Sequence, residues 1–364
     1  VFNILVFFKN KQHLYLLGIF VLGFLLRLIA AINLGVSADD MHHTLHAINF
    51  IGSGRLVTYD QSAGLWHLFT DLMYRLFGVN QLSSRIAALI FGSFSIIAVY
   101  LLSKEFFSKR ISLIAALLLA VSPFHIKSTV AEMDVMTLFF VLCSMLIFIR
   151  GLKENKNIQF AIAGIFLGLA IYTKVYPLLI IPSMLVYFAY YNKKNSRKIT
   201  SNKNVKKILI FLLCAFIFAI PTLTHNYLLY KDKGFLDLQF TNALGLGKEV
   251  SAKYYSWDSF FGEEHAWSSL IFGDVRHAPA GVPIILWVVN YVRTADPLNF
   301  YLGVIGIIIM FFVKKERKEY RIFFILSILF LLPFLASINL LAKHYLFLIV
   351  LLIPAGAFLI DKFN

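Results

Sequence analysis

Two adjacent carboxylates, Asp39 and Asp40, directly follow the first long apolar run of the chain. An Asp before a helix start is a good N-cap, because its side chain accepts backbone N–H groups, but that role suits only one of the pair. Ionisable groups at a membrane edge often mark function, although such carboxylates can also be simply solvated. The second Asp is therefore a candidate general base, a candidate metal ligand, or both.

A second acidic pair occurs in the segment "STVAEMDVM", where one residue separates Glu132 from Asp134. Two carboxylates at this spacing converge on one cation or one sugar only where the backbone is irregular or begins a helix. A helix cap accompanied by a solvated Glu is the alternative. We therefore predict that this pair binds either the acceptor or a metal ion.

Positively charged groups also occur at the helix ends of the acidic side, and those that we select are Arg27, Arg85, Lys174, Lys343 and His344. Snorkelling to lipid headgroups explains any one of them. Lys174 is the hardest to explain in this way, since it interrupts the apolar segment "GLAIYTKVYPLL". A cation buried at headgroup depth is well placed to bind a lipid-linked phosphate.

Histidines and acidic residues cluster in two further places. His42 and His46 are four residues apart and share one face of a predicted helix, while "GEEHAW" contains Glu264 and His265. Both patterns allow zinc, but neither has the spacing of a closed structural zinc site, and hydrogen-bonded histidines are the alternative. A divalent cation is accordingly the only cofactor that the sequence suggests.

The composition indicates that these residues belong to a membrane protein. The chain has 364 residues, of which 59% are hydrophobic and 15% are charged, which is far more apolar than a soluble domain. The net charge of +15 falls into short clusters between apolar runs, so we expect no nucleic acid partner. Cys143 and Cys214 lie within apolar runs, which makes a disulfide framework improbable.

About ten apolar runs approach the roughly 20 residues that a helix needs to cross a bilayer. The first is too long for a cleaved signal peptide, so we expect it to be retained as a helix. The predicted fold is all-α and integral to the membrane, with about ten transmembrane helices. The runs are 15–35, 84–103, 111–127, 134–150, 158–173, 175–191, 208–226, 299–313, 322–340 and 344–360.

The short basic loops fix the predicted orientation, because Lys and Arg concentrate in cytoplasmic loops. A cytoplasmic N-terminus puts all of these clusters inside the cell and leaves residues 36–83 and 227–298 outside. Within the first external loop, residues 40–51 and 64–77 have the pattern of interfacial helices. We thus predict a multi-pass protein of the cell membrane whose chemistry takes place on the non-cytoplasmic side.

Three parts follow from this organisation. Residues 1–226 form a membrane core that includes the first external loop, residues 227–298 form an external segment, and residues 299–364 form the C-terminal transmembrane helices.

In order, the segments "SADDMHHTLHAINFIGSG", "LFGVNQLSSRIAALIFGSF", "SPFHIKSTVAEMD" and "GLAIYTKVYPLL" resemble the GT-C glycosyltransferases. They are most similar to the protein O-mannosyltransferase-like branch, which includes dolichyl-phosphate-mannose-protein mannosyltransferases and aminoarabinose transferase-like proteins. The resemblance is clearest over residues 15–190. The family's proline-rich segment after Ser-Gly is replaced here by "SAGLWH", which puts the type of acceptor in doubt.

The resemblance implies roles for individual residues. Asp39 falls on the family's presumed catalytic base, and Asp40 stands where Glu is usual. Arg85 and Lys174 match cations that bind the donor phosphate, and "KHYLFLIVLLIP" places Lys343 and His344 where the family has an Arg.

The implied activity is transfer of a hexosyl or pentosyl group, with inversion, from a polyprenyl-phosphate sugar to an acceptor hydroxyl on a protein, lipid or glycan. A transporter or flippase of a lipid-linked or anionic solute is the alternative. That function predicts charges near the bilayer midplane and paired broken helices, whereas the ionisable residues of this chain are concentrated at one predicted surface. A scaffold that lacks activity is a third hypothesis, and the presence of Asp39 argues against it.

Overall fold

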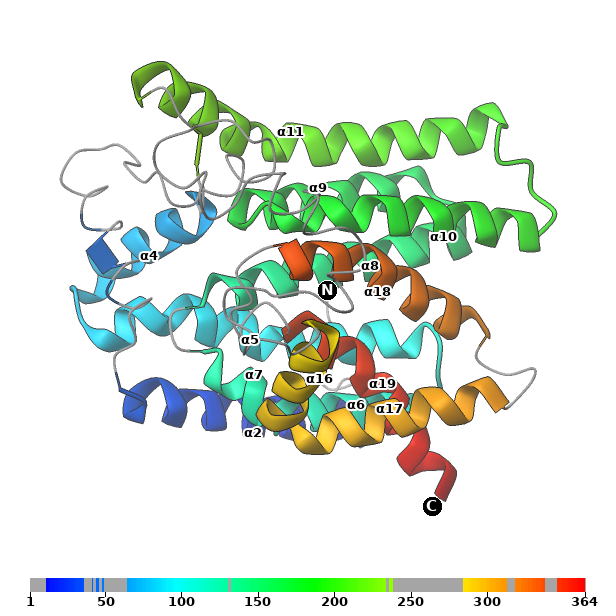
Figure 1. Cartoon of the computed structure of the whole chain (residues 1–364), viewed down its shortest axis with the longest axis horizontal. Helices are drawn as coiled ribbons and strands as arrows, with labels where there is room; N and C mark the ends of the chain where they lie inside the picture. Colours follow the sequence, from blue (N-terminus) through cyan, green and yellow to red (C-terminus); the bar gives the residue numbers. More distant parts are fainter. Residues whose placement is uncertain are drawn as a thin grey trace.

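The computed structural model of this chain is a bundle of α-helices, many of which run along one common direction (Figure 1). It describes residues 11–35, 41, 44, 45, 48, 64–129, 132–233, 236, 237, 284–312, 318–337 and 346–363, and these contain no strand. The all-α prediction is therefore confirmed.

The helices follow one another along the chain with mostly short turns. The N-terminal group consists of α2 (Lys11–Asn33), α4 (Gly64–Phe77), α5 (Gln81–Lys104), α6 (Lys109–Ala120) and α7 (Pro123–Lys127). The central group consists of α8 (Met133–Glu154), α9 (Asn157–Thr173), the 3-10 turn η1 (Tyr176–Leu179), α10 (Ile180–Lys194) and α11 (Asn202–Lys233). The C-terminal group consists of α16 (Ile284–Ala295), α17 (Pro297–Phe312), α18 (Lys318–Ser337) and α19 (Leu346–Phe363).

Five of the described helices are long and apolar enough to cross a membrane: α2, α5, α8, α11 and α19. Two shorter apolar helices, α9 and α17, accompany them. Large apolar side chains such as Leu25, Ile29, Leu209 and Leu213 are exposed on α2 and α11. Such a surface is stable in lipid and would be unfavourable in water, so the protein is membrane-embedded.

The two ends of the bundle differ in what they contain. The Lys174 end, on the left in Figure 1, holds the end of α2, the starts of α5 and α8, the end of α9, and α4 lying across it. The Glu105 end lies opposite and holds the turns from α5 to α6, from α8 to α9 and from α10 to α11. Glu105 itself pairs there with Arg150 and Lys153.

Two of the predicted runs are interrupted at prolines. The run 111–127 is divided into α6 and α7, because the Ser122 side chain caps α7 by accepting the N–H of His125, and Pro123 begins that helix. The run 175–191 begins with the turn η1, which contains Pro177. These breaks place polar groups at the Lys174 end of the bundle.

One of the two helices predicted within residues 36–83 is observed. The predicted helix 64–77 is confirmed by α4, which ends at Gly78 with a φ of 74°, a left-handed conformation that glycine adopts without strain. Asn80 and Ser83 then form a capping box that begins α5. Most of the predicted helix 40–51 lies outside the described residues.

A Gly-x-x-x-Gly pattern lets α9 and α11 approach closely, and the two helices lie side by side in Figure 1. A Cβ atom added at Gly164 would lie 2.3 Å from the Phe211 carbonyl oxygen, and one at Gly168 would lie 2.6 Å from the Ala215 carbonyl oxygen. Small residues at such spacing are typical of helix contacts in membranes.

Replacing Gly164 by valine should therefore push α9 and α11 apart. We expect it to lower the free energy of unfolding by about 1–3 kcal/mol, the usual cost of overpacking a core. The measurement is a denaturant titration of purified protein in detergent micelles. Gly18→Val is the matched control, because nothing lies within 4 Å of a Cβ at Gly18. Equal losses for both variants would contradict the close packing.

Candidate active site

A buried ion pair between Lys174 and Asp134 is the central feature of the Lys174 end. The Lys174 Nζ atom lies 2.9 Å from each carboxylate oxygen, and the two side chains are only 3% and 2% exposed. Lys174 has extended backbone after the last turn of α9, while Asp134 lies in the first turn of α8. The sequence analysis selected both residues but did not predict that they pair.

Aromatic and acidic groups surround this pair. The Tyr176 ring is buried, and its centroid lies 5.8 Å from Lys174 Nζ, within cation–π range. Glu132 precedes α8, two residues before Asp134. Burial raises the pKa of the Tyr291 phenol, and the negative charge of Glu132 raises it further. Tyr291 belongs to α16, so this helix lies near the turn that contains Glu132.

Arg85 has a role that the sequence did not reveal. Its guanidinium is fully buried and donates to the carbonyl oxygens of Ala31, Leu34 and Gly35 at 2.8–2.9 Å. These are carbonyls at and just beyond the C-terminal end of α2, which otherwise lack helical partners. Arg85 thus holds the chain at Gly35, directly before the segment 36–63, and its contact with a phosphate stays a prediction.

Gly64, which follows the segment 36–63, packs against the end of α9. It is the first residue of α4, and an added Cβ would lie 2.4 Å from the Tyr172 ring. Tyr172 is two residues before Lys174. The residues that flank the segment 36–63 are therefore held by Arg85 on one side and by the end of α9 on the other.

Known proteins share this arrangement of helices. Residues 64–225 match the sequence model of the family described as dolichyl-phosphate-mannose-protein mannosyltransferase. The structure of ArnT from Cupriavidus metallidurans bound to undecaprenyl phosphate is similar with a TM-score of 0.63 and 14% identity, covering 96% of this chain and 60% of ArnT. The chain therefore has the same helical fold as ArnT.

Two further proteins are similar to this chain. The oligosaccharyltransferase AglB from Archaeoglobus fulgidus, in complex with an inhibitory peptide and a dolichol-phosphate, has a TM-score of 0.60 and 15% identity over 98% of this chain and 50% of AglB. An uncharacterised protein of Aquifex aeolicus (strain VF5) is 26% identical over 207 residues, which are 53% of this chain and 42% of that protein. This chain thus spans less than two thirds of these relatives' lengths.

Several predicted site residues lie outside the described residues, so their roles stay predictions: Asp39, Asp40, His42, His46, Glu264, His265, Lys343 and His344.

Metal binding also stays a prediction. Within the described ranges, no three His, Cys, Asp or Glu side chains come together, and both oxygens of Asp134 contact the Lys174 ammonium. An ammonium beside a carboxylate disfavours a divalent cation at the same oxygens. We therefore derive no catalytic step that requires a metal ion.

Arg27 forms a second buried polar cluster that the sequence analysis did not assign. It is fully buried and donates to the carbonyl oxygens of Gly23, Leu119 and Ala120 and to His125 Nδ1, at 2.9–3.0 Å. A guanidinium can only donate, so Nδ1 must accept and the imidazole is neutral. These bonds tie α2 to the end of α6 and to α7, and an Arg inside an apolar run was the available signal.

Replacing Arg27 by methionine should destabilise the bundle strongly. The change leaves buried carbonyl oxygens at the end of α6 without donors, and each such group costs about 1–3 kcal/mol. We expect a total loss of about 3 kcal/mol or more in the free energy of unfolding. Thermal unfolding of the purified protein measures it.

Arg110→Met is the control for this change. Arg110 is 64% exposed and pairs with the partly exposed Asp361, and pairs near the surface contribute little to stability. A loss for Arg27→Met no larger than the loss for Arg110→Met would contradict the structural role of Arg27.

Asp296 anchors the junction of α16 and α17. Its buried carboxylate accepts from the Ser122 hydroxyl and from the side-chain amide of Asn299. The Asn299 amide also donates to the Leu118 carbonyl oxygen at 3.3 Å. Through these bonds and a Phe124–Tyr291 ring contact, α16 and α17 pack against α7, near Glu132.

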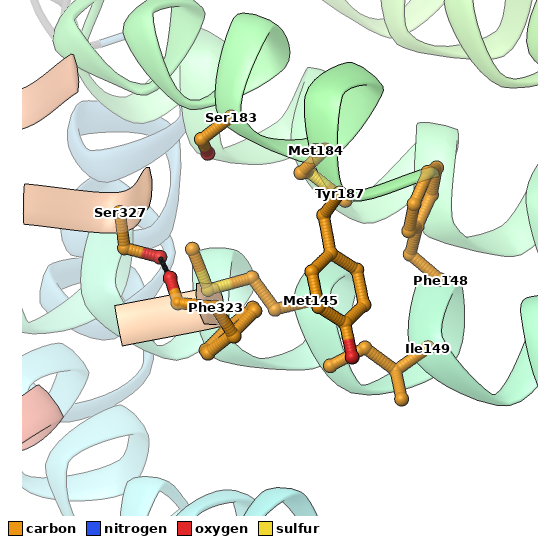
Figure 2. Close-up of a pocket in the computed structure, with 8 residues that line it drawn as sticks. All are labelled: Met145, Phe148, Ile149, Ser183, Met184, Tyr187, Phe323 and Ser327. Carbon is orange, nitrogen blue, oxygen red and sulfur yellow. Dashed lines mark hydrogen bonds between the residues drawn. The ribbon is translucent and has the colours of Figure 1, made fainter. Parts of the chain in front are cut away.

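An apolar recess lies away from the Lys174–Asp134 ion pair. It has a volume of about 240 Å³ between α8, α10 and α18, and its lining includes Phe148, Met184, Tyr187 and Phe323 (Figure 2). Its Ser327 hydroxyl donates to the Phe323 carbonyl oxygen at 2.8 Å. The residues that line this recess include no charged side chain.

Proposed function

We propose that this protein transfers a sugar from a polyprenyl-phosphate-linked donor to an acceptor hydroxyl. The observation that carries the proposal is the buried Lys174–Asp134 pair, at the end of a GT-C bundle where both ends of the segment containing Asp39 are held. Undecaprenyl phosphate is bound to ArnT and dolichol-phosphate to AglB. A lipid phosphate in two proteins of this fold supports the same class of donor here.

Lys174 is the described cation best suited to the donor phosphate. Its ammonium is buried in the protein at the end of an apolar helix, where a lipid phosphate lies when its prenyl tail is in the bilayer. Charge that develops on a departing phosphate is stabilised most strongly by a fixed cation in a site shielded from water. His344 and Lys343 are proposed to assist, while Arg85 positions the start of the loop.

Asp39 is proposed as the base that activates the acceptor. It comes four residues after Gly35, whose carbonyl accepts from Arg85, and four residues span at most about 14 Å. This length is compatible with a carboxylate near the phosphate site. Asp40 is its proposed companion, and Glu132 is proposed to contact the acceptor or a metal ion.

The chemical step is a single displacement at the anomeric carbon of the sugar. The acceptor oxygen loses its proton to the Asp39 carboxylate and forms a bond to the anomeric carbon. The bond from that carbon to the phosphate oxygen breaks at the same time, and its electron pair leaves with the polyprenyl phosphate. Attack opposite to the leaving group inverts the configuration, as the family resemblance implies.

The orientation of the site is part of the proposal. Five basic residues lie at the Glu105 end, in the turn between α10 and α11 and in the adjoining helix ends: Lys193, Lys194, Arg197, Lys198 and Lys203. Because short basic loops stay in the cytoplasm, the Lys174 end would face the non-cytoplasmic side. The protein would then cross the membrane several times.

Reconstitution of the full-length protein in liposomes tests this function. Radiolabelled polyprenyl-phosphate sugars and an extract of membrane acceptors are added outside, and labelled product is separated by size and by solvent extraction. Product formation supports the proposal. Movement of labelled lipid across the bilayer without product would instead establish a flippase. If neither product nor lipid movement is observed, the enzyme assignment is overturned and a binding protein is the remaining interpretation.

A further inference from the structure

In the proposed reaction, the donor phosphate competes with Asp134 for the Lys174 ammonium. Both carboxylate oxygens lie 2.9 Å from Lys174 Nζ, so the ammonium already has an anionic partner before a donor arrives. A phosphate that binds Lys174 places a second anion beside Asp134. Two anions that share one buried cation repel each other, which weakens the binding of the second.

Asp134 is well supported as an anion even when Lys174 turns towards another partner. It lies in the first turn of α8, where the positive end of the helix dipole stabilises a carboxylate. Lys174 has a second attractive neighbour in the Tyr176 ring, 5.8 Å from its Nζ atom. Each charge therefore has a second source of stabilisation, and the Lys174 ammonium can be shared between Asp134 and a phosphate.

We propose that Asp134 is the resident counter-ion of Lys174 and competes with the lipid phosphate for its ammonium, which limits how tightly the polyprenyl phosphate product is held. This inference rests on the proposed function and adds a positioning role for Asp134. When the site is empty, Asp134 keeps the buried ammonium charged and in place. After sugar transfer, it displaces the phosphate and so speeds product release.

Binding of polyprenyl phosphate to the full-length protein in nanodiscs tests this competition. The Asp134→Asn variant keeps the shape of the side chain but removes its charge. We expect it to bind polyprenyl phosphate about tenfold more tightly, which corresponds to about 1.4 kcal/mol. In the transfer assay, kcat and the KM for donor should both fall, because product leaves slowly. A residue that only supported the fold would weaken binding.

Three further variants make the result specific. Lys174→Met should weaken binding at least tenfold. The Asp134→Asn/Lys174→Met double variant should bind more tightly than Lys174→Met, because the repelling carboxylate is gone, but less tightly than Asp134→Asn, because the ammonium is gone. Glu105→Gln removes a carboxylate from an ion pair at the opposite end of the bundle and should leave binding unchanged. If Asp134→Asn does not purify as a folded protein, Asp134→Ser removes the same charge and keeps a residue suited to a first helical turn.

The outcomes separate this inference from the function on which it rests. Unchanged or weaker binding in the folded Asp134 variants, together with weaker binding in Lys174→Met, overturns the counter-ion role and leaves the phosphate site intact. Absence of polyprenyl phosphate binding in the wild-type protein overturns both.

Discussion

Replacing Lys174 by methionine should reduce sugar transfer by about 10²–10³-fold, the usual effect of removing one fixed group that stabilises charge in the transition state. The reason is that the departing polyprenyl phosphate would lose the buried cation proposed to neutralise it. The measurement is the initial rate of labelled product formation by the reconstituted protein at saturating acceptor.

The single change also leaves Asp134 buried without its cation, and breaking such a pair costs about 3–5 kcal/mol. The Asp134→Asn/Lys174→Met double variant separates the two effects, because it removes both charges together. It should recover most of the lost stability but none of the activity. Restored transfer in the double variant would show that Lys174 acts only through stability.

Replacing Asp39 by asparagine should lower transfer by about 10²–10⁴-fold, the typical contribution of a general base. Asparagine keeps the size and polarity of the side chain but cannot accept the acceptor's proton. Binding of polyprenyl phosphate should stay within about twofold of wild type, since the base acts on the acceptor rather than on the donor phosphate. Initial rates and nanodisc binding measure the two effects separately.

Asp361→Asn is the matched control for this change, because Asp361 pairs with Arg110 at the opposite end of the bundle. It should leave the rate unchanged. Transfer by Asp39→Asn at a rate close to that of the control would exclude Asp39 as the base, and Asp40 would become the next candidate.

Helix positions were predictable because membrane burial demands long apolar runs. Within the described residues, the runs 111–127 and 175–191 are the ones that the structure divides. The prolines at 123 and 177 were visible, yet an apolar run alone does not show whether a proline bends a helix or ends it. The capping contact at Ser122 decides the first case. Helix α16, which precedes the apolar run 299–313, was not predicted because it is too short to span a bilayer.

Partners of the buried charges were not predictable in the same way. Arg85 and Lys174 were both selected as unusual cations, but only the structure distinguishes them. Arg85 donates to carbonyl oxygens at the end of α2, whereas Lys174 contacts the carboxylate of Asp134, 40 residues away. Arg27 was selected together with these cations, and in the structure its guanidinium links α2 to the end of α6 through hydrogen bonds.

Sequence alone determined that the chain is a helical membrane protein with acidic and basic residues at helix ends, because the bilayer imposes length and polarity on each segment separately. Tertiary structure decided which of those residues meet. A buried charge must find its counter-charge or hydrogen-bond partners wherever packing places them, and packing depends on close helix contacts such as that of Gly164 with Phe211. The pairing of Lys174 with Asp134 is set by those contacts, and spacing along the chain does not encode it.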